Sequence, residues 1–173
     1  MTLTLGQELA EMALITKEKI CDEWFIKLQQ TKSIDELIKM YISGIDFCFS
    51  NDYPSKDYIR QHFKGKMEEY GVFLDDTIAI DNKRKVILLG ESIASLTYTD
   101  FNVCQLYLRD NSIANVVAKD NCILCIDIFY NSKLNIVCND NCKLIINNFG
   151  GEINIEKSET VKVKLIDKGK KGY

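Results

Sequence analysis

The sequence predicts an α+β fold in which an N-terminal helical region is followed by a β-solenoid with two strands and about 20 residues in each coil. Up to Gly71, apolar residues recur at helical spacing. From Glu91 onward they occupy alternate positions, which is the period of a β-strand. Within this second part, asparagine recurs in ten-residue steps, at Asn111, Asn121, Asn131 and Asn141.

The repeating unit is twenty residues rather than ten, because alternate decapeptides share features that their neighbours lack. Serine recurs from Ser92 to Ser112 and Ser132, whereas Cys122 recurs as Cys142. An antiparallel meander gives no reason for odd and even units to differ, but a flattened solenoid stacks each residue on the one twenty positions later. We therefore expect about four coils, spaced roughly 4.8 Å apart.

The helical region begins with a segment from Thr4 to about Gln30, where the apolar spacing fits one long or two short helices. Ser33 followed by Glu36 has the form of a capping box, in which each side chain satisfies a free amide at a helix start. This box predicts a second helix that runs to about Cys48.

Pro54 pushes the preceding residue out of helical geometry, so the second helix ends before it. Ser55 can cap a third helix, and Gly71 supplies the left-handed residue that commonly closes a helix. Short strands are expected over 72–74, 77–80 and 85–89. The predicted organisation is a helical domain or cap over 1–71, transition strands over 72–90, the β-solenoid over 91–167 and a basic, fraying tail over 168–173.

Pairs of Asp and Asn mark the expected corners of the solenoid. Both residue types tolerate left-handed turn geometry and bond to the local backbone. In a stack of coils, each corner Asn can also bond to its equivalents above and below. The expected structural ladders are therefore Asn111, Asn121, Asn131 and Asn141 at the corners and Cys122 with Cys142 in the interior.

The cysteines have a spacing that could suit zinc, with Cys122 three residues before Cys125 and Cys138 four residues before Cys142. Strand parity argues against such a site, because Cys125 should emerge on the face opposite to the other three. The corner aspartates lack the glycines of calcium-binding β-rolls. We expect buried thiols, no metal and no cofactor.

Three aromatic residues near one corner, Phe129, Tyr130 and Phe149, are the candidate binding residues. They could form an exposed apolar patch, which on soluble proteins often marks a binding surface. A stacked structural ladder of the same rings is the alternative. The sequence alone leaves both open.

His62 is the only histidine, so a Ser-His or Cys-His catalytic scheme would have to use it. It falls on the third expected helix between Gln61 and Phe63, where packing or simple exposure explains it. The companion groups of a catalytic constellation are missing. We therefore expect no enzyme, and an enzyme that uses His62 is the least favoured hypothesis.

Composition limits the partners. The formal net charge of −3 gives no electrostatic footprint for nucleic acid, and no apolar run reaches the length of a membrane span. The seven cysteines are an odd number with no signal peptide before them, which favours a reducing, cytoplasmic compartment.

The run from Cys21-Asp-Glu-Trp24 through Tyr70-Gly-Val-Phe-Leu74, followed by the decapeptide ladder, resembles small uncharacterised proteins of gut-bacterial phages and mobile elements. The resemblance spans the chain. It implies the same layout of helices and then a β-solenoid, in the cytoplasm of a bacterial host, and it brings no established catalytic residue.

A solenoid exposes unpaired strand edges or apolar faces at its ends, and something must cover them. The leading hypothesis is therefore a non-enzymatic binding or assembly module that contacts a protein partner or a second copy of itself. The alternative is a phage-type inhibitor that binds a host defence protein or sequesters a small signalling molecule.

Overall fold

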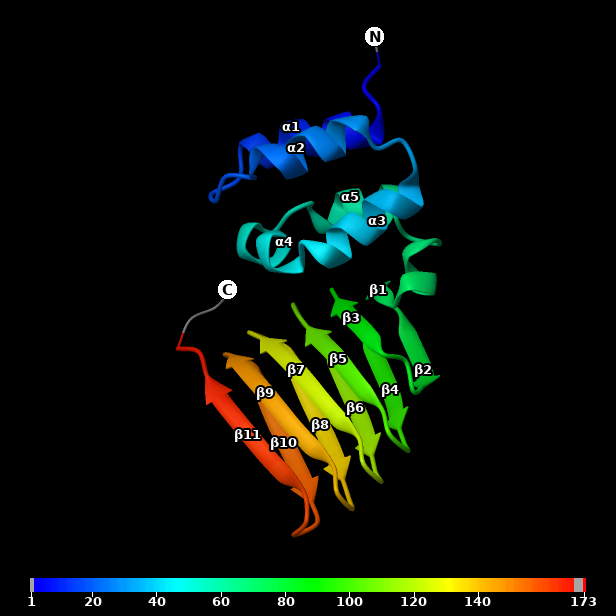
Figure 1. The fold of residues 1–173 in the computed structure, drawn as a ribbon, viewed down its shortest axis with the longest axis vertical. Coiled ribbons are helices and arrows are strands. Elements are labelled where there is room, and N and C mark those ends of the chain that lie inside the picture. Colours follow the sequence, from blue (N-terminus) through cyan, green and yellow to red (C-terminus); the bar gives the residue numbers. More distant parts are fainter. Residues whose placement is uncertain (1, 170–172) are drawn as a thin grey trace. The chain divides into compact units, whose positions relative to one another are not determined.

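The structure is a computed structural model that describes residues 2–169 and Tyr173 (Figure 1). The chain divides into two compact units, a helical unit that ends at Tyr70 and a solenoid unit that begins at Gly71. The predicted fold class is confirmed, because helices come first and a β-solenoid of two parallel sheets follows. Of the expected tail, residues 170–172 lie outside the described residues. Among those described, no helix is long and apolar enough to cross a membrane.

The helical unit contains more and shorter helices than the apolar spacing indicated. The first segment forms two short helices, which is one of the two expected arrangements, whereas the expected second helix divides at Gly44, which ends α3 and begins α4. The elements are α1 Leu5–Leu14, α2 Asp22–Gln30, α3 Ile34–Ser43, α4 Ile45–Asn51, α5 Lys56–His62 and a 3₁₀ turn at Met67–Tyr70.

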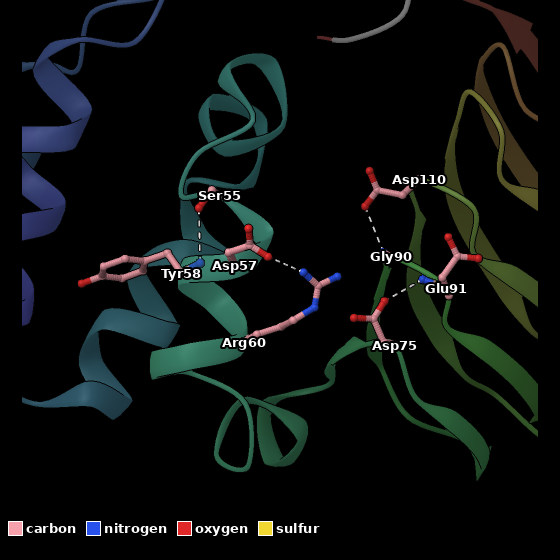
Figure 2. Close-up of polar contacts among 8 residues, drawn as sticks. All are labelled: Ser55, Asp57, Tyr58, Arg60, Asp75, Gly90, Glu91 and Asp110. Carbon is pink, nitrogen blue, oxygen red and sulfur yellow. Dashed lines mark hydrogen bonds and ion pairs between the residues drawn. The ribbon is translucent and has the colours of Figure 1, made fainter.

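The predicted caps begin the expected helices. The Ser33 hydroxyl accepts a hydrogen bond from the amide of Glu36 at 3.4 Å. The Ser55 hydroxyl accepts one from the amide of Tyr58 at 3.2 Å (Figure 2). Gly71 has the left-handed φ of +86°, but it follows the 3₁₀ turn Met67–Tyr70 and does not close the third helix, which ends earlier, at His62.

The solenoid unit contains eleven strands in the described part of the chain, and every pairing between them is parallel. The odd-numbered strands form one sheet and the even-numbered strands the other, so each coil contributes one strand to each sheet. The strands are β1 Val72–Leu74, β2 Thr77–Asp81, β3 Lys85–Leu89, β4 Ile93–Tyr98, β5 Val103–Leu108, β6 Ile113–Ala118, β7 Ile123–Phe129, β8 Lys133–Cys138, β9 Lys143–Phe149, β10 Glu152–Lys157 and β11 Lys162–Asp167.

The register confirms the twenty-residue period. Ile113 pairs with Lys133, and Val103 pairs with Ile123. The strands over 72–89 pair with the later ones, so residues expected to form a transition build the first coil, and the solenoid has about five coils rather than four.

The corners differ from the expectation in one respect. Aspartate, not asparagine, takes the left-handed φ at most of them, with Asn82 and Asn131 as the exceptions. At three of these corners, Asp110, Asp120 and Asp140, the carboxylate also accepts a hydrogen bond from a backbone amide of the preceding coil. Asp110 accepts from Gly90 at 2.9 Å (Figure 2), and Asp120 accepts from Asp100 at 3.0 Å. The corner aspartates therefore join successive coils.

We predict that Asp120→Ala lowers the free energy of unfolding by about 2 kcal/mol. The change removes a charge-assisted hydrogen bond to a backbone amide. It also places alanine, whose side chain cannot bond to the local backbone, in left-handed geometry. Asp120→Asn keeps an acceptor oxygen and tolerates that geometry, so it is the matched control and should cost less than about 1 kcal/mol. Urea unfolding followed by circular dichroism measures both, and equal losses would contradict the coil-joining role.

A second prediction concerns the contact between α1 and α2. A Cβ atom added at Gly6 would lie 2.3 Å from the carbonyl oxygens of both Leu28 and Thr31, so the backbones must separate to admit it. Overpacking of this kind costs about 1–3 kcal/mol. Gly6→Ala should therefore lower the thermal midpoint by several degrees. Gly44→Ala, whose Cβ would meet its nearest atom at 3.5 Å, is the control and should change it little.

Candidate functional site

The aromatic residues predicted as a binding corner are mostly buried. Phe129 is 0% and Phe149 is 3% exposed, and Tyr130 is half-buried. The two phenylalanine rings stack with centroids 4.6 Å apart and planes at 9°. This corrects the expectation of an exposed aromatic patch, because rings twenty residues apart in a parallel stack cover each other. The stacked ladder is the arrangement that the structure has.

A cationic side chain lies at each end of this stack of two phenylalanine rings. The Arg109 guanidinium lies 5.9 Å from the centroid of Phe129, and the Lys168 ammonium lies 5.9 Å from that of Phe149. Arg109 is itself buried. The column uses cation–π attraction to stabilise a corner at which Tyr130, not an aspartate, is the residue equivalent to Asp110.

The asparagines of the ladder make contacts at the corners and between successive coils. The backbone amides of Asn121 and Asn141 donate to carbonyls of the preceding coil, at 3.2 and 2.9 Å. The Asn111 amide group donates to the Glu91 carboxylate at 2.5 Å, and Asn131 occupies a left-handed corner. These contacts hold coils together.

The cysteines divide by strand parity as predicted. Cys122, Cys138 and Cys142 are 0% exposed, whereas Cys125 is partly exposed on the other face of its strand. Burial is the largest cause that raises the pKa of Cys138, to about 12. Burial likewise raises the pKa of Cys104 to about 11. These thiols stay protonated at neutral pH, and the described residues contain no group of three metal-ligating side chains.

His62 lies at the end of α5 and packs against Tyr58, with ring centroids 4.3 Å apart. The Tyr58 hydroxyl donates to the Glu8 carboxylate at 3.2 Å. His62 is not among the residues that line the cavity described next.

A cavity of about 310 Å³ in the helical unit is the candidate functional site that the sequence did not reveal. Apolar and aromatic side chains dominate its wall. The lining residues are Leu9, Ile20, Cys21, Trp24, Leu28, Leu37, Met40, Tyr41, Ser43, Gly44, Asp46, Phe47, Cys48, Tyr53, Pro54 and Phe63. They come from α1 to α4 and the segments around α5, so no single helix carries the site.

The Tyr53 and Ser43 hydroxyls of this lining already have partners. The Tyr53 hydroxyl donates to the carbonyl of Leu9 at 2.7 Å, and burial is the main cause that raises its pKa, so the group stays neutral. The Ser43 hydroxyl donates to the carbonyl of Lys39 at 2.8 Å. The interior of the cavity therefore presents apolar surface to a ligand.

Asp46 is the only carboxylate among the lining residues, and it is exposed at the surface. Its oxygen accepts a hydrogen bond from the amide of Phe47 at 2.8 Å. The lining contains no lysine or arginine. An anionic ligand would therefore find no opposite charge in the wall and one like charge at the edge.

The sequence carried only an indirect signal for this site. Trp24 is one of the apolar residues at helical spacing before Gln30, and such stripes normally fill a core. Whether packed helices leave a space depends on their crossing geometry, which a stripe does not specify. No family model, curated protein or solved structure matches the chain.

The burial pattern predicts which thiols react in the folded protein. Cys21 is exposed and Cys125 is partly exposed, whereas the other five thiols are buried. Iodoacetamide at pH 7.5 should therefore modify Cys21 first and Cys125 more slowly. The interior thiols should react only after unfolding in urea, as counted by mass spectrometry. Early modification of Cys122 or Cys142 in the native protein would contradict the interior ladder.

Proposed function

We propose that the chain is a non-enzymatic binding module whose helical unit takes up an uncharged apolar small molecule. The observation that carries the proposal is the cavity of about 310 Å³ lined by Trp24, Phe47 and other apolar side chains. Its size lies at the lower end of the range, about 300–1,000 Å³, that holds small ligands in proteins.

The chemistry of the wall supports an uncharged ligand. A charged group that enters an apolar site loses its hydration and must find a partner there. The Tyr53 and Ser43 hydroxyls are already engaged with backbone carbonyls. An apolar body displaces poorly bonded water and gains the burial term of about 25 cal/mol per Å².

Two observations support the non-enzymatic part. His62 lies outside the lining, and burial raises the pKa of the Cys104 and Cys138 thiols, which keeps them in their unreactive protonated form. Sequestering a small molecule is also one form of the inhibitor hypothesis, and the cavity favours that form over the binding of a host defence protein. The phage resemblance itself stays a prediction.

The chain offers an internal reporter for the test. Trp24 is its only tryptophan, and it lines the cavity. Energy transfer from Trp24 to the neutral dye N-phenyl-1-naphthylamine measures binding directly. We expect saturable transfer, and binding at least tenfold weaker for the matched anion 8-anilino-1-naphthalenesulfonate, because its sulfonate finds no cation in the wall.

A cavity-filling variant tests whether the dye binds in the cavity. A Cβ at Gly44 would lie 3.8 Å from the Trp24 ring, so Gly44→Leu puts its side chain beside that ring. It should weaken dye binding at least tenfold, about 1.4 kcal/mol. Gln30→Leu adds a similar side chain at an exposed position outside the lining and is the control. Unchanged affinity in folded Gly44→Leu, or equal affinity for the two dyes, would refute the proposal.

A further inference from the structure

The last coil of the solenoid has an open edge. β10 and β11 are the final strands of their sheets, and no other strand in the described part of the chain pairs with their outer edges. An inward-facing side chain of this coil is also more exposed than its equivalent in the coil before. Leu165 is 54% exposed, whereas Ile146, the residue it stacks on in β9, is 0% exposed.

The two edge strands carry opposite charge on their outward faces. Along β10 the outward residues are Glu152, Asn154 and Glu156, and along β11 they are Lys162, Lys164 and Ile166, as the alternation in each strand shows. Glu152 already bonds Lys133 of its own chain at 2.7 Å. One edge is therefore acidic and the other basic.

We propose that a second copy of this chain binds the open coil, related by a twofold axis parallel to the strands. Figure 1 shows that β10 and β11 run in opposite directions within the coil. The rotation places β11 of the second copy beside β10, antiparallel to it, and the reverse pairing forms at the same time. Both sheets then continue from one copy into the other, and no edge of the last coil stays unpaired.

The charges select this arrangement over the other twofold one. An axis perpendicular to the sheets would pair β10 with β10 and β11 with β11, so carboxylates would face carboxylates and ammonium groups would face ammonium groups. Like charges directly opposite in a sheet are destabilising. Pairing β10 with β11 brings the acidic edge against the basic one at both contacts.

Symmetry also limits the register, because outward residues of β10 must lie opposite outward residues of β11, and the proposed pairing joins the two charged residues nearest the turn at 158–161. Rotation about an axis along the strands leaves each position along the strand unchanged, and the turn at 158–161 places Glu156 and Lys162 at the same end of the coil. Glu156 then lies opposite Lys162 of the second copy. On the inward side, Ile155 lies opposite Val163 and Ile153 opposite Leu165, so the apolar interior continues across the contact.

The inference is independent of the proposed ligand, because it uses only residues of the solenoid unit. Light scattering coupled to size-exclusion chromatography, over a hundredfold range of concentration, tests it on the whole chain. We expect a reversible dimer. A monomer at the highest concentration, or growth into open chains, would overturn the proposal.

Charge reversal tests the pairing itself. Glu156→Lys and Lys162→Glu should each weaken the dimer at least tenfold, because each creates two like-charge contacts in the symmetric pair. The double variant Glu156→Lys/Lys162→Glu should restore it, and an equimolar mixture of the two single variants should form heterodimers. Recovery in the mixture also shows that both single variants are folded.

The controls make the same changes of charge elsewhere. Glu11→Lys in α1 and Lys119→Glu in a middle coil are both exposed, and neither should alter the dimer. A stronger dimer in Glu156→Lys would indicate pairing of β10 with β10, since the new lysine would face an acidic edge. That result, or equal weakening by the control variants, would overturn the proposed arrangement.

Discussion

The solenoid depends on one constraint, which is that each residue lies on its equivalent in the next coil, in parallel register. A parallel stack brings like side chains together, so every column must tolerate its own repetition. Apolar columns do so by packing, as Leu124 does on Leu144. Asparagine does so because its amide both donates and accepts, as when Asn135 donates to Asn115 at 2.9 Å. Like charges stacked in a column repel each other, and the corner aspartates Asp110 and Asp120 avoid this because each carboxylate bonds to a backbone amide of the coil before it instead of facing another carboxylate.

Departures from the repeat show how narrow this tolerance is. At the turn after β9 the chain drops one residue, so the last coil pairs at a spacing of nineteen, with Lys162 beside Lys143. Asn148 replaces an inward apolar residue there, and its side-chain oxygen accepts from the amides of Gly150 and Gly151, both at 2.9 Å. A Cβ atom at Gly151 would lie 2.4 Å from Ile128, so the shortened turn needs glycine at that position. The column of Phe129 and Phe149 solves a similar problem with ring stacking and with cations at its ends.

The same constraint explains what the sequence could predict. In a stacked fold the geometry repeats at a fixed number of residues, and the sequence shows the same period. The two sheets, the inward positions and the interior position of Cys122 could therefore be predicted from the repeat length and the alternation along each strand. The exposure of Phe129 did not follow, because a period says that rings stack but not that they cover each other fully. The helical unit has no period. Its break at Gly44 and its cavity arise from packing between different helices, and the apolar stripe that contains Trp24 is the same for a filled core and for a hollow one.

The parts of the molecule that are suited to binding therefore lie outside the repeat, in the helical unit and at the last coil. Inside the stack, asparagine side chains bond to the next coil, as Asn135 does to Asn115, and buried thiols such as Cys104 and Cys138 have a pKa raised by burial, so little remains there for a ligand to bind. The helical unit packs unlike side chains against one another and can leave a shaped space without breaking a rule of the fold. Among the described residues, no strand pairs with the outer edges of β10 and β11, so these edges and the half-exposed Leu165 are open to pairing. A binding cavity and an assembly edge are thus the two features that a chain of this architecture can vary without disturbing the stack between its corners.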